Sequence, residues 1–278
     1  MIILYDIPST LERKAWSPST FKTRIALNFK ALPYQTEWVE LPDIEKVVRE
    51  IGGLPTAKNS DGTDHYTLPA IRDLSTGAVV TDSDAIAHYL DVTYPAPKYP
   101  TLFPSFDTLG FPSTKLMTYT AVSSFRQLLS VYGRATMAIT FPAGNSILNP
   151  VSEVHNRVRK EKLVSTMYGK PTTLEDLSPP GPIRDAAWVE VRKGLEKIYQ
   201  VLDKNRIYSD KEGKKLVFFF GETPSYADIC LLASLMYIKS VLQENEEWKM
   251  ILDWSEGRFG NFLEATKEYI DQIMIKIR

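Results

Sequence analysis

The first side chain with the chemistry to hold a ligand is the hydroxyl of Ser17, at the start of a predicted helix. Pro18 follows and fits the first helical position, where no backbone N–H is needed. Phe21, Ile25 and Phe29 then recur four residues apart, which gives the helix one apolar face. The first turn of a helix presents free N–H groups and partial positive charge, so a hydroxyl there can help to bind an anion or a thiolate. Ser17 can equally be an ordinary helix cap, and this motif alone leaves both interpretations open.

Two further pairs of residues combine polar groups with accessible backbone. Leu68-Pro69 precedes a predicted strand; a cis bond there would leave the Leu68 backbone free to pair with an extended, peptide-like ligand. The alternative is a trans proline at the first residue of a strand. Asp82-Ser83 begins another predicted helix, and its carboxylate and hydroxyl suit the ammonium and carboxylate of an α-amino acid. Taken alone, this pair is also compatible with a simple cap.

Short strands and helices alternate as far as residue 94 and position these three motifs. In order they are a strand at 2–5, a helix at 18–30, a strand at 35–41, a helix at 42–51, a loop at 52–64, strands at 68–71 and 79–81, and a helix at 82–93. A β-α-β-α-β-β-α order in this length predicts a small mixed sheet with helices packed on its faces.

The rest of the chain predicts a helical domain that follows a proline-rich linker. Prolines at 95, 97, 100, 104 and 112 interrupt any helical or strand period. Helical periodicity follows at 116–132, 152–167, 184–202, 225–242 and 262–277, with loops at 147–150 and 172–182. We therefore expect an α/β N-terminal domain at 1–94, a linker at 95–112 and an all-α C-terminal domain at 113–278.

Composition excludes several classes of partner. The 278 residues carry 33 Lys+Arg against 34 Asp+Glu, which predicts neither a nucleic-acid nor a membrane-surface partner. No apolar stretch reaches the roughly 18 residues that span a bilayer, and the first residues lack the pattern of a secretory signal. Cys230 is the single cysteine, which excludes an internal disulfide framework, and the histidines share no metal-ligand spacing. We expect a cytoplasmic protein without a metal.

The three motifs occur in order on this frame, and together they resemble the thioredoxin-like N-terminal domain of cytosolic glutathione transferases. The run SPSTFKTRIAL from Ser17 is similar to the serine-type classes, and LPAIRDLSTGAVVTDSDAIAHYLDVTYP from Leu68 is similar to the glutathione-recognition segment. In the second domain, GETPSYADI at 221–229 resembles the family's capping box, with Ser225 as the cap and Asp228 reaching back to it. The combination is most similar to the fungal class related to bacterial β-etherases, called FuA.

This resemblance implies that glutathione binds as a co-substrate across the three motifs. Ser17 would hydrogen-bond the glutathione sulfur. Leu68, before a cis Pro69, would pair its backbone with the cysteinyl part. Asp82 and Ser83 would hold the γ-glutamyl head.

The motifs specify the remaining parts of the site less closely. In this family the glycine end of glutathione usually meets a basic or amide side chain near the second helix, where Lys46 and Arg49 are candidates. The acceptor pocket is expected between the domains, with Phe21, Tyr119 and Phe125 as candidate lining. Core packing is the alternative for each of these aromatic side chains. The chain exceeds small transferases near 144–173 and 177–182, and these segments are expected to reshape the pocket or the dimer edge.

The resemblance predicts a glutathione transferase that conjugates the thiolate to small hydrophobic, aromatic electrophiles, as in detoxification, and that forms a homodimer. Because serine forms no mixed disulfide with glutathione, conjugation, or peroxide reduction by the bound thiolate, is favoured over thiol-reductase chemistry. Two alternatives stay open: a non-catalytic, ligandin-type carrier of aromatic compounds, and a glutathione-dependent β-etherase-like lyase.

Overall fold

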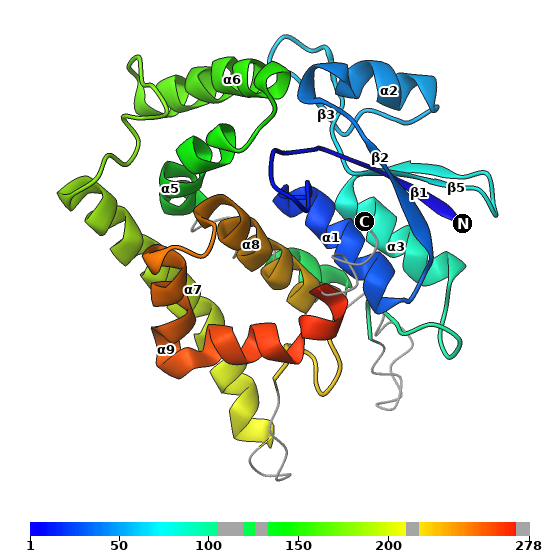
Figure 1. Ribbon diagram of the computed structural model, residues 1–278. Coiled ribbons are helices and arrows are strands. Elements are labelled where there is room, and N and C mark those ends of the chain that lie inside the picture. The colour runs from blue at the N-terminus through cyan, green and yellow to red at the C-terminus, as the bar shows by residue number, and fades with distance from the viewer. Residues whose placement is uncertain (105–118, 126–132, 210–216, 271–278) are drawn as a thin grey trace.

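A computed structural model describes residues 1–104, 119–125, 133–209 and 217–270 (Figure 1). Its first part is built on a four-stranded sheet in the order β2-β1-β5-β6. The strands are β1 (Ile2–Asp6), β2 (Tyr34–Trp38), β5 (Ala70–Asp73) and β6 (Val79–Thr81). β1 runs parallel to β2 and antiparallel to β5, and β5 is antiparallel to β6.

Three helices and one short turn of helix flank this sheet. They are α1 (Pro18–Phe29), η1 (Leu41–Asp43), α2 (Ile44–Glu50) and α3 (Ser83–Thr93). α1 and α3 pack side by side on one face of the sheet, and α2 lies on the other side (Figure 1). The apolar face predicted for α1 is buried, with Phe21 and Ile25 fully enclosed in the core. The thioredoxin-like N-terminal domain is therefore confirmed.

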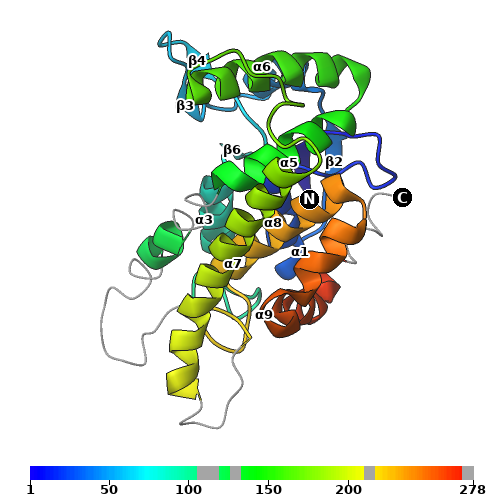
Figure 2. The same ribbon diagram turned by 90° about the vertical axis from the view of Figure 1, so that its left-hand side faces the viewer.

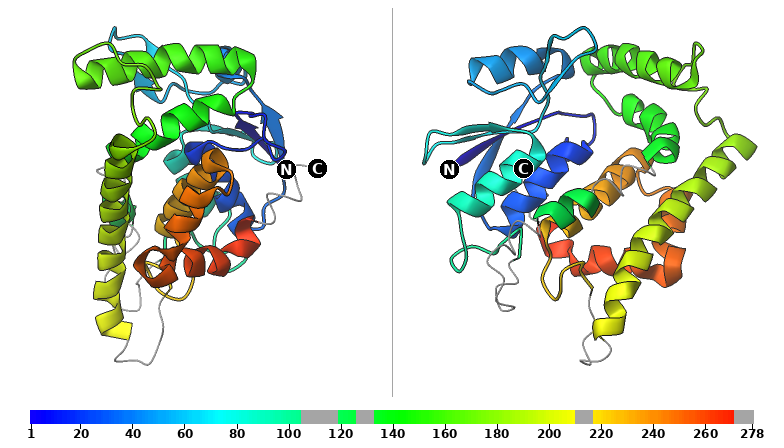
Figure 3. Two further views of the ribbon diagram at one scale, coloured as in Figure 1. Left: turned by 60° about the vertical axis from the view of Figure 1, so that its left-hand side comes forward. Right: turned by 180° about the vertical axis from the view of Figure 1, so that it is seen from behind.

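The second part is helical, as predicted. Its helices are α5 (Gly133–Ser146), α6 (Pro150–Tyr168), α7 (Pro182–Ser209), α8 (Tyr226–Leu242) and α9 (Glu246–Ala265), and residues 119–125 are also helical. α8 packs directly against α1, so one continuous cluster of buried apolar side chains runs through both parts (Figure 1). α7 runs along the outer side of the helical part (Figure 2). α6 lies across one end of the helical part (Figures 2 and 3).

Three elements differ from the prediction. α5 was not expected, because Pro142 and the glycines within Gly133–Ser146 conceal its helical period. The loop expected at 52–64 contributes to a small hairpin of β3 (Ala57–Lys58) and β4 (Asp64–His65). α9 begins at Glu246 rather than at residue 262, and it consists of two helical stretches separated by a break at 254–257, where the backbone angles are non-helical.

Three predicted segments lie partly outside the described residues. They are the helix predicted at 116–132 (residues 116–118 and 126–132), the helix predicted at 262–277 (residues 271–277) and the linker (residues 105–112). Within the ranges that are described, no helix is long and apolar enough to cross a membrane.

A buried ion pair positions α1 against the sheet. Arg24 of α1 donates from Nε to Asp6 Oδ2 of β1 at 2.5 Å, and neither side chain is exposed. Its Nη2 also donates to the Thr36 hydroxyl of β2 at 2.9 Å. Asp6 accepts a second hydrogen bond from the Ile7 N–H at 2.7 Å. The geometry between β1 and α1, and hence the place of the α1 N-terminus, is fixed by these contacts because an unpaired buried charge would be strongly destabilising.

Candidate active site

Ser17 occupies the N-cap position of α1, yet its side chain makes no capping hydrogen bond within the described residues. The backbone has extended angles (φ −71°, ψ 132°), and the Ser17 carbonyl accepts from the Phe21 N–H at 2.9 Å. Its hydroxyl lines a cavity and is 7% exposed as a residue. Of the two interpretations that the sequence left open, simple capping is therefore not what this hydroxyl does. It is available to a ligand at the positive end of a helix.

The Leu68–Pro69 peptide bond is cis, as the resemblance predicts. Leu68 comes just before the paired part of β5, whose register with β1 begins at Tyr5 and Ala70. Thr67 and Leu68 line the same cavity as Ser17. The backbone of Leu68 thus lies next to the α1 N-terminus and outside the sheet ladder, where an extended ligand can pair with it.

Asp82 and Ser83 stand at the start of α3, outside the residues that line the cavity. Asp82 has a positive φ of 76° and caps the helix, because its Oδ1 accepts from the N–H groups of Asp84 at 2.9 Å and Ala85 at 3.2 Å. Tyr226, at the first position of α8, donates from its hydroxyl to the Ser83 carbonyl at 2.8 Å. The helical part of the molecule therefore holds the start of α3 in place.

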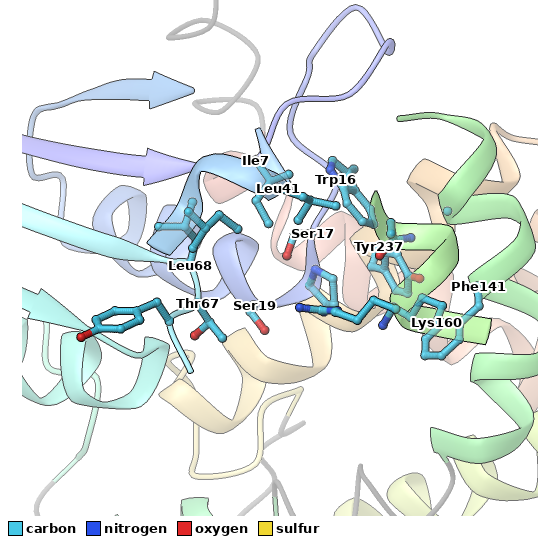
Figure 4. Close-up of a pocket in the computed structure, with 16 residues that line it drawn as sticks. Ile7, Trp16, Ser17, Ser19, Leu41, Thr67, Leu68, Phe141, Lys160 and Tyr237 are labelled. Carbon is cyan, nitrogen blue, oxygen red and sulfur yellow. The ribbon is translucent and has the colours of Figure 1, made fainter. Parts of the chain in front are cut away.

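The cavity has a volume of about 290 Å³ and two chemically distinct ends (Figure 4). Thr67, Leu68 and Ser19 lie at one end, and Ser17 lies between the ends. Aromatic rings and one ammonium group make the other end, contributed by Trp16, Phe141, Tyr237 and Lys160. The rings of Trp16 and Tyr237 are 6.0 Å apart, centroid to centroid.

The three aromatic side chains proposed from sequence for the acceptor pocket do not line this cavity. Phe21 is fully buried in the core, because the apolar face of α1 turns toward the sheet and α8. Tyr119 is 37% exposed and its ring contacts His88, with centroids 5.9 Å apart. Phe125 is buried against Phe219, with ring centroids 4.0 Å apart. Phe21 and Phe125 are therefore core residues, which was the alternative interpretation of their sequence positions.

The cationic groups of the cavity are also not those expected from sequence. Arg49 pairs with Glu45 at 3.0 Å and lies 4.4 Å from the centroid of the Tyr66 ring, and neither it nor Lys46 lines the cavity. Arg159 and Lys160 of α6 do. Both come from the segment at 144–173 that was expected to reshape the pocket, and its α6 does form part of the wall.

The electrostatic environment of Lys160 is unusual for a lysine. Its Nζ lies 3.9 Å from the centroid of the Phe141 ring. Burial, with the neighbouring charge of Arg159, lowers the pKa of Lys160 to about 8. Burial and the charge of Arg159 also lower the pKa of His65 on β4. The charge of Arg159 thus acts on both His65 and Lys160, while Lys160 itself lies at the aromatic end of the cavity, against Phe141.

The matches with known protein families cover both parts of the chain. Residues 16–93 match the family model described as the glutathione S-transferase N-terminal domain, and residues 123–269 match the one described as the C-terminal domain. The chain belongs to the glutathione S-transferase family. The N-terminal match contains Ser17 and Leu68, and the C-terminal match contains Lys160, so both glutathione S-transferase domains contribute to the cavity.

Fungal glutathione S-transferases are among the solved structures similar to this chain. CsGST63524 of Ceriporiopsis subvermispora, in complex with glutathione, is 39% identical with a TM-score of 0.82 and covers 96% of this chain and 97% of its own. GSTFuA3 of Phanerochaete chrysosporium is 35% identical with a TM-score of 0.80, and the match covers 96% of each chain. A glutathione S-transferase-like protein, ustS, of Aspergillus flavus is 29% identical over 276 residues, covering 96% of this chain and 90% of its own. The resemblance to the fungal FuA class is thereby confirmed.

Proposed function

We propose that this chain is a glutathione transferase in which Ser17 stabilises the glutathione thiolate. The observation that carries the proposal is the free hydroxyl of Ser17 at the N-terminus of α1, facing a cavity that it shares with Leu68. The similarity to a fungal relative crystallised with glutathione supports it.

The chemistry follows from the acidity of a thiol. A free thiol has a pKa of about 8.5, so only a few per cent is ionised near neutral pH. A hydroxyl donor and the partial positive charge of the α1 N-terminus both favour the anion; lowering the pKa by about two units raises the thiolate fraction more than tenfold. The thiolate attacks an electrophilic carbon, a carbon–sulfur bond forms, and the leaving group departs with its bonding electron pair.

We place the peptide backbone of glutathione along the polar end of the cavity. Its cysteinyl part pairs with the backbone of Leu68, and its γ-glutamyl head reaches Asp82 and Ser83 beyond the cavity edge. For the glycyl carboxylate we propose Arg159, which lines the cavity and whose charge lowers the pKa of His65 on β4. This replaces Lys46 and Arg49, which lie outside the lining.

The aromatic end of the cavity is the proposed acceptor site. Trp16, Phe141 and Tyr237 offer flat apolar surfaces close to Ser17, where the sulfur would lie (Figure 4). Such faces stack on aromatic rings and exclude water from the reacting atoms. We therefore propose hydrophobic, aromatic electrophiles as acceptors.

The test compares Ser17→Ala with Ser19→Ala, using 1-chloro-2,4-dinitrobenzene as the acceptor. Both serines line the cavity at the start of α1, so the second variant is a matched control. At saturating glutathione, loss of the Ser17 hydrogen bond should lower turnover by about ten- to a hundredfold, while Ser19→Ala, which leaves the Ser17 hydroxyl in place, should change it little. Unchanged turnover in Ser17→Ala would remove Ser17 from the mechanism.

A binding measurement with aromatic compounds and product analysis with an aryl ether separate the two alternative functions. A ligandin-type carrier would bind aromatic compounds tightly in both variants and turn over no electrophile. A β-etherase-like lyase would release a phenol and a glutathione adduct from an aryl ether. Homodimerisation and a cytoplasmic location, both expected from the family, are tested by light scattering and by cell fractionation.

A further inference from the structure

Lys160 is a cation at the aromatic end of the cavity, away from the groups assigned to glutathione. Its Nζ lies 3.9 Å from the centroid of the Phe141 ring, and Trp16 and Tyr237 line the same end (Figure 4). A cation above an aromatic ring is attracted by the ring electrons, which fixes the ammonium in position. The contact uses one side of the ammonium and leaves other N–H donors for a ligand.

No carboxylate partners Lys160 in the described part of the chain. The 16 lining residues include no aspartate or glutamate. Arg157, three residues earlier on α6, is in contrast surrounded by acids: its guanidinium pairs with Glu153 at 2.9 Å and with Glu175 at 2.8 Å. Glu161 also pairs with Arg157, at 3.4 Å. The acidic side chains around this helix therefore neutralise Arg157 on the outside and leave Lys160 uncompensated inside.

A half-buried ammonium without a counter-ion is costly, because it has lost water and gained no anion. The lowered pKa of Lys160 reflects the same imbalance. An anion that enters the cavity would restore the missing interaction, and in a site with restricted water this interaction is stronger than at the surface.

We propose that Lys160 binds a carboxylate on the acceptor, so that the preferred acceptors are aromatic acids. This inference rests on the proposed transferase function and specifies the substrate class of its acceptor site. One ammonium matches one carboxylate, and the surrounding rings match the aromatic ring that carries it. Lys160 is thus a specificity-determining residue, whereas Ser17 acts on the sulfur.

The helix geometry of α6 separates this role from that of Arg159. Arg159 and Lys160 are consecutive, so their side chains leave the helix about 100° apart; Arg159 is exposed, whereas Lys160 is half-buried against the Phe141 ring. Tyr237 is not a competing anion site, because its hydroxyl donates to the Thr140 carbonyl at 3.2 Å. Lys160 therefore provides the cationic group at the aromatic end in the described residues.

The test uses two acceptors of similar shape, 4-chloro-3,5-dinitrobenzoate and 4-chloro-3,5-dinitrobenzamide, of which only the first carries a negative charge. In both, the glutathione sulfur bonds to the ring carbon that carries chlorine, and chloride leaves with the electron pair. The variants are Lys160→Met, which keeps the length without the charge, and Lys160→Arg, which keeps the charge. Lys162→Met is the matched control, since Lys162 is exposed on the same helix and does not line the cavity.

In Lys160→Met, kcat/KM for the benzoate should fall by about tenfold or more, while kcat/KM for the benzamide should change less than about threefold. Lys160→Arg should retain most of the activity with the benzoate, and Lys162→Met should behave like the wild type. The dissociation constant of glutathione, measured by calorimetry, should be the same in all four proteins. Thermal unfolding checks that each variant is folded.

An equal fall with both acceptors would overturn the inference. Weaker glutathione binding in Lys160→Met would also overturn it, by placing Lys160 in the glutathione site while the transferase function stands. If the wild type conjugates neither acceptor, the transferase proposal fails, and calorimetry with the unreacted acceptors decides the inference separately. Tighter binding of the benzoate than of the benzamide, lost in Lys160→Met, would support it; equal binding would contradict it.

Discussion

The carboxylate of Glu40, which follows β2, accepts a hydrogen bond from the side-chain amide of Asn149 at 2.7 Å. Asn149 is the residue immediately before α6. The hydroxyl of Ser152, in the first turn of α6, donates to the same carboxylate, and its oxygen accepts from the Leu41 N–H at 2.8 Å. A single carboxylate thus joins the sheet to the helix that carries Arg159 and Lys160 into the cavity.

Replacing Glu40 with alanine should loosen the start of α6. Two side-chain donors would lose their acceptor, and we expect a loss of about 1–3 kcal/mol in the free energy of unfolding. Amide hydrogen exchange at 153–156, which begins with the Glu153 N–H bonded to the Asn149 carbonyl at 2.8 Å, should become faster, as should local opening of the cavity wall. Glu37→Ala, at an exposed position on β2, is the control. Unchanged exchange in Glu40→Ala would show that α6 is held by other contacts.

Tyr226 should support glutathione binding from a distance. Its hydroxyl bonds the Ser83 carbonyl at 2.8 Å and Asp84 Oδ1 at 3.0 Å, at the helix start proposed to hold the γ-glutamyl head. We expect Tyr226→Phe to weaken glutathione binding by about three- to tenfold, corresponding to the loss of one or two hydrogen bonds. Calorimetry measures this, with the exposed Tyr168→Phe as control. Equal affinities in the two variants would contradict the supporting role.

The fold was largely predictable because its signals are local. The proline after Ser17, the alternating strands and the turn before Val79 each specify their own segment, and the observed sheet follows from them. α5 was missed because Pro142 and Gly144 oppose a helix locally, so its helicity depends on tertiary contacts. Gly144 lies 3.6 Å from Trp16 when measured from the position of an added Cβ, which indicates close packing against the cavity wall.

The candidate site was only partly predictable. Ser17 and Leu68 were identified because backbone-dependent motifs mark them, and the structure brings them to one cavity. Trp16 could have been predicted to line the cavity, because it directly precedes Ser17. Nothing in the sequence marks Tyr237 as a site residue. α8 is apolar around most of its circumference, so the sequence does not distinguish the side of α8 that faces the cavity from the side that faces the core. Lys160 lies in a run of basic residues that resembles a solvated face.

Binding of an aromatic carboxylate should depend on pH through Lys160. Its pKa of about 8 means that the ammonium is charged below that pH and neutral above it. Affinity for 4-chloro-3,5-dinitrobenzoate should therefore be highest below about pH 8 and decline as the pH rises through it. The other titratable groups nearby do not change charge in this range: Arg159 stays cationic, the pKa of Tyr237 is raised to about 12, and that of His65 is lowered. Calorimetry at several pH values should show no such decline in Lys160→Arg.

Asp228 should make the stability of the fold depend on pH in the opposite sense to most carboxylates. It closes the capping box of α8, and burial raises its pKa to about 6. The pKa of this carboxyl group in the unfolded chain is about 3.9. Between about pH 4 and about pH 6, the folded state therefore holds a proton that the unfolded state has released, and the free energy of unfolding falls as the pH rises. Relative to Asp228→Asn, the wild type should gain about 1 kcal/mol between about pH 7 and about pH 5. Urea unfolding at both pH values measures this, with the exposed Asp253→Asn as control. A constant difference between wild type and Asp228→Asn would contradict the prediction.

In the proposed mechanism, the Ser17 hydroxyl stabilises the thiolate of bound glutathione. The most direct measurement is a pH titration of the ultraviolet thiolate absorbance of bound glutathione in the wild type, Ser17→Ala and Ser19→Ala. We predict a thiol pKa about two units below that of free glutathione in the wild type and in Ser19→Ala, and a clear rise toward the free value in Ser17→Ala. An unchanged pKa in Ser17→Ala, or a rise in Ser19→Ala instead, would rule out Ser17 as the group that stabilises the thiolate.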